Sequence, residues 1–124
     1  MQTITSEKAA PAGGPYSPAL LVDDWVFLAG QGGSDPATGT LEATIEEQTE
    51  QTLANVSALL EAAGCTLADV VSSLVHLSNL EDFDRFNAVY ERHFGEPRPV
   101  RTTVGAQLLH GMLVEITVVA RRRG

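Results

Sequence analysis

The clearest pattern of apolar positions along the chain predicts a helix over residues 44–63. Apolar side chains recur with a period near 3.6 residues, at Ile45, Leu53, Val56, Leu59, Leu60 and Ala63. Thr44 followed by Glu47 is typical of a capping box, and Gly64 suits the position just after a helix end. A second helix is predicted over Leu80–Phe94, where aromatic and apolar side chains gather on or near one face before Gly95.

The remaining apolar segments predict strands separated by turns. The segments are Gln2–Ser6, Ala19–Val22, Trp25–Ala29, Val70–Leu77, Val100–Leu108 and Leu113–Arg121. Asp23-Asp24 predicts an acidic hairpin turn between the second and third of them. His110-Gly111 turns the chain between the last two, so we expect those two strands to be neighbours.

The order of these elements predicts an α+β fold. Each helix follows a strand and returns the chain to another strand, so both helices should cover one face of a single mixed β-sheet. The expected architecture is therefore a two-layer sandwich. With 124 residues and no repeat or linker, we expect a single domain over residues 1–124.

The last predicted strand is apolar on both of its faces. Side chains alternate along a strand, so one face takes Val114, Ile116, Val118 and Ala120 and the other takes Leu113, Glu115, Thr117 and Val119. An apolar second face is unexpected in water. We therefore expect another subunit to cover it in a homo-oligomer.

Composition and charge narrow the class of function. Hydrophobic residues make up 44% of the chain, enough for a packed core. Eight Lys and Arg against 16 Asp and Glu give a net charge of −8, which disfavours nucleic-acid binding. The chain lacks a signal-peptide pattern and any apolar run near the ~20 residues of a membrane span, so we expect a cytoplasmic protein with no membrane contact. Cys65 is the only cysteine and the three histidines lack metal-ligand spacing, so we expect no metal and no cofactor.

Two charged residues interrupt apolar strands and are candidates for chemistry. Glu115 stands in LVEITVVA, where a carboxylate is costly unless it is paired or solvated in a cleft. Arg101 opens the preceding strand and shares a face with Thr103. A guanidinium matches a planar carboxylate ligand. The alternative is a structural role, either an ion pair between Arg101 and Glu115 or exposure to solvent at a sheet edge. The sequence leaves the strand register, and thus the choice, open.

Three further positions are weaker candidates. Tyr16 lies in a stiff proline- and glycine-rich loop, as a rigid binding group or a packing residue. Gly30 begins Gly-Gln-Gly-Gly after a strand, where backbone N–H groups can approach a ligand, although the spacing matches no phosphate-binding motif. Asn87 lies on the aromatic helix, where a residue of this type is most often simply at the surface.

These motifs resemble the RidA/YjgF family of small trimeric imine deaminases over nearly the whole chain. In order along the sequence they are GPYSPA, FLAGQ, DPATGTL, EQTEQTLANVSALLEAAG, SNLEDF, FNAVYERHFG, PVRTTV and VEITVVA. The resemblance implies a chorismate mutase-like fold and a homotrimer whose open sheet faces pack into a central barrel. It also implies sites between neighbouring subunits.

The resemblance further implies hydrolysis of reactive 2-imino acids and their enamine tautomers to 2-keto acids and ammonia. By matching motifs, Arg101 binds the substrate carboxylate, Glu115 positions or activates water, and Tyr16, Gly30 and Asn87 line the site. Thr103 stands where members commonly have Cys, and Ala29 where they commonly have Ser, which leaves the substrate side chain open.

The alternatives to a deaminase are a non-catalytic trimer that binds small carboxylate metabolites or a chaperone-like partner. The ribonuclease activity sometimes attached to this family is disfavoured by the acidic charge.

Overall fold

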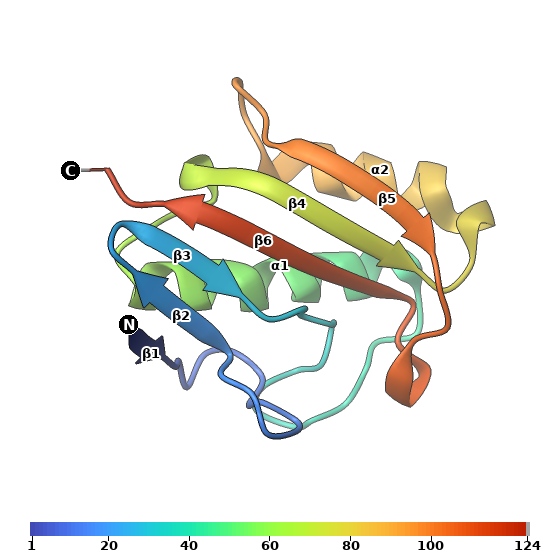
Figure 1. The fold of residues 1–124 in the computed structure, drawn as a ribbon. Helices are drawn as coiled ribbons and strands as arrows, with labels where there is room; N and C mark the ends of the chain where they lie inside the picture. Colours follow the sequence, from blue (N-terminus) through green and yellow to red (C-terminus); the bar gives the residue numbers. More distant parts are fainter. Residues whose placement is uncertain (124) are drawn as a thin grey trace.

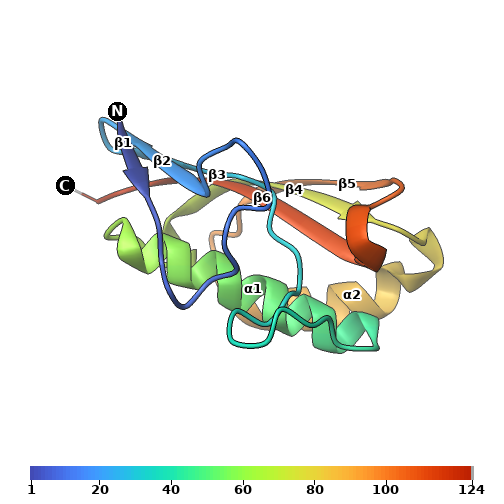
Figure 2. The same cartoon turned by 90° about the horizontal axis from the view of Figure 1, so that it is seen from below.

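A six-stranded mixed β-sheet carries two α-helices on one face in the computed structural model, which describes residues 1–123 (Figure 1). The strands are β1 (Gln2–Ile4), β2 (Ala19–Val22), β3 (Trp25–Leu28), β4 (Val70–Leu77), β5 (Val100–Gly105) and β6 (Val114–Arg121). Their order across the sheet is β1-β2-β3-β6-β4-β5. Figure 2 shows helices α1 (Ile45–Ala62) and α2 (Phe83–Tyr90) together beneath the sheet. The two-layer α+β architecture expected from the sequence is confirmed.

Helix α1 begins where the sequence predicts, directly after Thr44. The Thr44 hydroxyl accepts a hydrogen bond from the backbone N–H of Glu47 at 3.1 Å and donates one to its carboxylate at 2.9 Å. The first of these satisfies one of the free N–H groups of the first turn. Val56 and Leu60 are fully buried in the core between the helix and the sheet. The apolar period of the sequence thus marks the side of the helix that packs.

The second helix is shorter than the sequence predicts. The α-helical geometry covers Phe83–Tyr90 only, and 3₁₀ turns at Leu80–Asp82 and Glu91–His93 occupy most of the remaining expected length. The side chain of Asn79 accepts a hydrogen bond from the backbone N–H of Glu81, which caps the first of these turns. Tighter turns of this kind are frequent at helix ends. The chain thus follows the expected path, but the first and last turns of this segment are 3₁₀-helical rather than α-helical.

The last two strands are not neighbours, so this prediction was wrong. Strand β5 pairs in parallel with β4, whereas β6 lies antiparallel between β3 and β4. Helix α2 connects β4 to β5, and a crossover helix returns the chain parallel to the strand that it left. Strand β5 is therefore at the edge of the sheet, and the strongly apolar β6 is at its centre.

Strand β6 alternates between the two faces as the sequence predicts. Four side chains are completely buried against the helix layer: Val114, Ile116, Val118 and Ala120. The residues between them are half-buried on the opposite face: Glu115, Thr117 and Val119. The helix-facing side of β6 thus forms part of the core, and Glu115 points to the opposite side of the sheet.

The sheet face opposite the helices is apolar and open in a single chain. The strand register places five large apolar side chains on it, each at least 37% exposed: Trp25, Phe27, Leu74, Val100 and Val104. Contiguous apolar surfaces of this kind mark interaction sites. The open face agrees with the expectation that further copies of the chain cover it.

Replacing a core leucine by alanine should destabilise the protein much more than the same change at the surface. Leu60 is fully buried, whereas Leu80 is 55% exposed. We expect Leu60→Ala to lower the free energy of unfolding by about 3 kcal/mol through lost burial and a cavity. Leu80→Ala should change it by less than about 1 kcal/mol. Urea denaturation followed by circular dichroism measures both, and similar losses for the two variants would contradict the packing described here.

Candidate active site

Arg101 is held at the edge of the sheet by residues of helix α2. Its Nη1 donates a hydrogen bond to Oδ1 of Asn87 at 2.7 Å. Its guanidinium carbon lies 4.8 Å from the centre of the Tyr90 ring, and 5.6 and 5.7 Å from those of Phe83 and Phe86. Side chains three and four residues apart share one side of a helix, which explains how α2 presents the amide and the rings together. Aromatic faces and one amide oxygen thus fix the guanidinium in position.

Several buried polar atoms near Arg101 lack a hydrogen-bond partner among residues 1–123. They are Oγ of Ser73, which is directly opposite Arg101 in the sheet, the Tyr90 hydroxyl, and Oγ1 of Thr103. Burial raises the pKa of the Tyr90 phenol, an effect that the nearby Ser73 hydroxyl and the Arg101 charge only partly offset, although the two hydroxyls do not reach hydrogen-bond geometry. Buried polar groups without partners are uncommon in proteins. They mark this region as one that can accept further polar contacts.

A hollow of about 360 Å³ opens beside the guanidinium. It is lined by Asn87, Tyr90, Glu91, Arg98, Pro99 and Arg101. A guanidinium has five N–H donors, and the described hydrogen bonds of Arg101 use one of them. The unused donors can bind a planar carboxylate in two-pronged fashion.

Glu115 lies on the other face of the sheet, in a second group of residues. It is directly opposite His76 of β4, and its Oε1 lies 3.7 Å from Nδ1 of that imidazole. The segment after β3 crosses beside it, because Gln31 exchanges two backbone hydrogen bonds of 2.9 Å with Ile116. A Cβ at Gly30 would stand 2.6 Å from Cδ of Glu115. Glycine is therefore the residue that allows the carboxylate its present position.

Arg101 and Glu115 do not meet within one chain. Arg101 is opposite Ser73, whereas Glu115 is opposite His76, three residues further along the same strand. Positions an odd number of residues apart point to opposite faces of a sheet. The structural ion pair considered from the sequence is therefore excluded for a single chain, and each charged group keeps its own surroundings.

A third feature is a hollow at one end of the two central strands, two residues beyond the His76–Glu115 pair. A hollow of about 600 Å³ is lined by Ser78, Gln107, Leu108, Leu109, Gly111, Met112 and Leu113. Ser78 and Leu113 each lie two residues from the His76–Glu115 pair, and the backbone of one donates to that of the other at 3.1 Å. Glu115 and His76 are not among its lining residues, so the hollow begins beyond the pair, toward one end of the two strands.

Tyr16 lies outside both groups. It is 53% exposed, and its hydroxyl accepts a hydrogen bond from the backbone N–H of Gly13 at 3.0 Å. Its own N–H donates to the carbonyl of Gly14, so the described contacts of the ring hold its own loop in shape. Within one chain, the structure brings together Arg101, Asn87 and Thr103, and separately Glu115 and Gly30, while Tyr16 stands apart.

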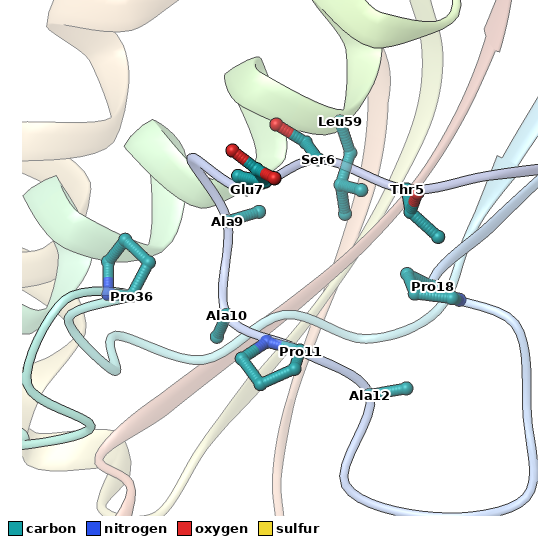
Figure 3. Close-up of a pocket in the computed structure, with 10 residues that line it drawn as sticks. All are labelled: Thr5, Ser6, Glu7, Ala9, Ala10, Pro11, Ala12, Pro18, Pro36 and Leu59. Atoms are coloured by element: carbon teal, nitrogen blue, oxygen red, sulfur yellow. The ribbon is translucent and has the colours of Figure 1, made fainter.

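A further hollow, of about 520 Å³, lies beneath the N-terminal loop (Figure 3). Its lining is mostly alanine and proline, with Glu7 as its one charged side chain. The complete set is Thr5, Ser6, Glu7, Ala9, Ala10, Pro11, Ala12, Pro18, Pro36 and Leu59. None of the candidate residues from the sequence lines it. This hollow is therefore separate from the two charged groups of the sheet.

His76 is the neighbour of Glu115 that sequence reasoning missed. The sequence suggested only structural or surface roles for the three histidines, because their spacing indicates no metal site. The pairing of His76 with Glu115 depends on the register between β4 and β6. These strands are far apart in the sequence, since Leu77 at the end of β4 and its partner Val114 at the start of β6 are 37 positions apart. The alternation of side chains along β4 predicts the sheet face on which the imidazole lies, but not which residue of a neighbouring strand lies beside it.

Residues 1–123 contain neither a cluster of metal ligands nor a helix suited to span a membrane. No group of three or more His, Cys, Asp or Glu side chains in this range is arranged to hold a metal ion. No helix in the same range combines the length and apolar character needed to cross a membrane.

Known proteins are similar in sequence to nearly the full length of this chain. The family model described as Endoribonuclease L-PSP matches residues 6–122. A RutC family protein of Saccharolobus solfataricus is 43% identical over 123 residues, which are 98% of each chain. The 2-iminobutanoate/2-iminopropanoate deaminase of Bos taurus is 40% identical over 119 residues, 94% of this chain and 87% of that protein.

A solved structure agrees with the fold. The crystal structure of RidA from an Antarctic Psychrobacter species superposes with a TM-score of 0.95 at 40% identity. The match covers 98% of this chain and 99% of that one. The whole two-layer sandwich, including the elements that carry both charged groups, is thus shared.

Adding one methyl group at Gly30 should displace the carboxylate of Glu115 and leave the fold intact. The methyl carbon of Gly30→Ala would meet the flexible end of the Glu115 side chain, which can rotate away at small cost. We expect a crystal structure of this variant to show the carboxylate turned away from His76. Gly95→Ala is the control, because nothing lies within 4 Å of its added Cβ. An unmoved Glu115 in Gly30→Ala would contradict the close approach.

Proposed function

The chain belongs to the Endoribonuclease L-PSP family, which includes the RidA/YjgF proteins, and we propose that it hydrolyses reactive 2-imino acids and their enamine tautomers to 2-keto acids and ammonia. The name of the Bos taurus relative supports this reaction class. The observation that carries the proposal in this chain is a fixed guanidinium with free donors together with a half-buried carboxylate on the open, apolar face of the sheet. These are the two groups that the hydrolysis needs.

Arg101 would bind and orient the substrate. A 2-imino acid carries a carboxylate beside the electrophilic imine carbon, and the guanidinium can hold it by two parallel hydrogen bonds. Asn87 and the ring of Tyr90 keep that fork rigid. Orientation of this kind lowers the barrier because the reacting atoms no longer need to find one another. Thr103, two residues along the strand, would contribute its free hydroxyl to the same region.

Glu115 would handle the proton. As a carboxylate it accepts a proton from a water molecule while the water oxygen forms a bond to the imine carbon. Returning this proton to the nitrogen gives a carbinolamine. Transfer of the remaining hydroxyl proton to the nitrogen then lets the carbon–nitrogen bond break, so that ammonia leaves and the carbon–oxygen single bond becomes the C=O bond of the ketone. One water is consumed, and no electrons are transferred to or from the protein. Gly30 would let the carboxylate lie close to the backbone on the open face of the sheet.

Assembly into a homotrimer would unite the two halves of the site. Within one chain the guanidinium and the carboxylate face opposite sides of the sheet. Strand β5, which carries Arg101, is an edge strand, and the face that carries Glu115 is apolar and open. Packing the open face of one copy against the β5 edge of the next would place Arg101 of one chain near Glu115 of another. Tyr16 and Gly30 would line the same cleft.

A protein that only binds small carboxylates is the second candidate. Arg101 fits both functions, whereas a carboxylate on an apolar face has no use in binding an anion and would repel it. Glu115 therefore favours the deaminase. The net charge of −8 similarly disfavours the cleavage of RNA, whose phosphates the chain would repel.

The proposed reaction can be tested by supplying 2-imino acids from an amino-acid oxidase and measuring the release of ammonia. We expect the wild type to exceed the uncatalysed rate and Arg101→Ala to fall close to it, because the substrate carboxylate loses its anchor. Glu115→Gln should lower kcat by about 10²–10⁴-fold, as expected for loss of a general base. Arg85→Ala, which removes an exposed arginine paired with Glu46, is the matched control and should be fully active. A wild type no faster than buffer with several imino acids would refute the deaminase.

The oligomer can be tested by placing a charge on the open face. We expect native mass spectrometry of the wild type to give three times the chain mass of 13.2 kDa. Leu74→Asp should yield monomers, because a carboxylate buried in an apolar interface loses its hydration. Ala54→Asp, on the exposed side of α1, is the control and should remain trimeric. A monomeric wild type would contradict the proposed assembly.

A further inference from the structure

The histidine beside Glu115 has a buried nitrogen without a hydrogen-bond partner. Nδ1 of His76 is inaccessible to solvent and makes no hydrogen bond with any of residues 1–123. Its nearest charged neighbour is Oε1 of Glu115 at 3.7 Å. The two residues are direct cross-strand partners of β4 and β6, so the sheet itself holds them together. A small rotation of either side chain would convert the contact into a hydrogen bond.

No other titratable group faces this imidazole from the strands around it. Strand β5 places Val104 directly beside His76, with Thr102 next along the same face. Strand β6 places Glu115 opposite it and Thr117 next along. Arg101 belongs to the other face of the sheet, and the segment that crosses after β3 carries no ionisable side chain at this point. Within one chain, Glu115 and His76 therefore form a pair of ionisable groups with no third one on the strands beside them, and in the proposed trimer Arg101 of a neighbouring copy would be the next charge near Glu115.

We propose that His76 is a positioning residue for Glu115, and that its imidazolium form keeps the carboxylate ionised and oriented. Histidine is the side chain that ordinarily changes charge between about pH 5 and 8. When protonated, it donates from Nδ1 to Oε1 and attracts the negative charge across a partly buried gap. When neutral, it releases the carboxylate, which becomes a stronger base. The pair makes the site respond to pH in this range.

This inference rests on the proposed function for its catalytic meaning, although the coupling of the two groups does not. If Glu115 must be a carboxylate to accept a proton from water, protonated His76 extends activity toward acidic pH. Removing the imidazole should then shift the acid limb of the profile to higher pH. Once the pH is high enough for the imidazole to have lost its proton, its removal should matter little.

Nuclear magnetic resonance tests the coupling without reference to activity. The ring signals of His76, assigned by comparison with His76→Gln, are followed against pH in the wild type and in Glu115→Gln. We expect the midpoint of His76 to fall by about 0.5 pH unit or more in Glu115→Gln, because the imidazolium loses its counter-charge. The carboxyl carbon of Glu115 in the wild type should also respond to the titration of His76, which gives the same test without a substitution.

A second histidine–glutamate pair provides matched controls. Nε2 of His93 lies 2.9 Å from Oε2 of Glu50 on the exposed side of the helix layer. Glu50→Gln should lower the midpoint of His93 and leave that of His76 unchanged. An unaltered midpoint of His76 in Glu115→Gln, with no response of the Glu115 carboxyl carbon, would overturn the inference.

The pH profile of kcat/KM then separates the two proposals. We expect His76→Gln to lose activity at a higher pH than the wild type does, whereas His93→Gln should follow the wild type throughout. Coupled titration in a protein without deaminase activity would refute the proposed function and leave the ionisable pair intact. Superimposable profiles of His76→Gln and wild type would overturn the positioning role.

Discussion

The burial of one face of strand β6 is the constraint on which the rest of the structure depends. Ile116 and Val118 must pack against the helix layer, and a strand cannot turn these side chains inward without turning Glu115 and Thr117 outward. The central position of β6 then determines that β4 lies on one side of Glu115 and the segment after β3 on the other. A single packing requirement thus gives the carboxylate its face, its imidazole neighbour and its backbone neighbour.

Helix α2 produces a very different setting for the guanidinium. It returns the chain to an edge strand and covers the inner side of that strand with three aromatic rings and the amide of Asn87. The cation is therefore rigid and partly covered, and it still has donors available toward a hollow. The fold separates Arg101, the proposed binding group, from Glu115, the proposed proton-handling group, because the two side chains lie on opposite faces of one sheet. That separation makes contact between copies of the chain a chemical requirement of the proposed hydrolysis as well as a way to cover apolar surface.

Small residues set how closely the parts of the site approach. Gly30 admits the carboxylate of Glu115 against the backbone, and Gly32 similarly leaves room for Met112. Asn55 adds a tie from the helix layer, since its amide donates to the carbonyls of Gly32 and Ser34 at 2.9 Å. The segment after β3 is thus fixed on both of its sides. A rigid backbone beside a flexible carboxylate limits the positions that the carboxylate can take.

The sequence by itself determined the features that depend on neighbours along the chain. The period and cap of α1, the hairpin turn at Asp23-Asp24, the two faces of β6 and the chemical types at Arg101 and Glu115 all follow from local patterns. Only the tertiary structure decided which strands pair and in what register. It separated β5 from β6, brought His76 to Glu115, and joined Asn87 to Arg101. Alternation assigns a side chain to a face but not to a partner, because pairing depends on packing between segments far apart in the chain.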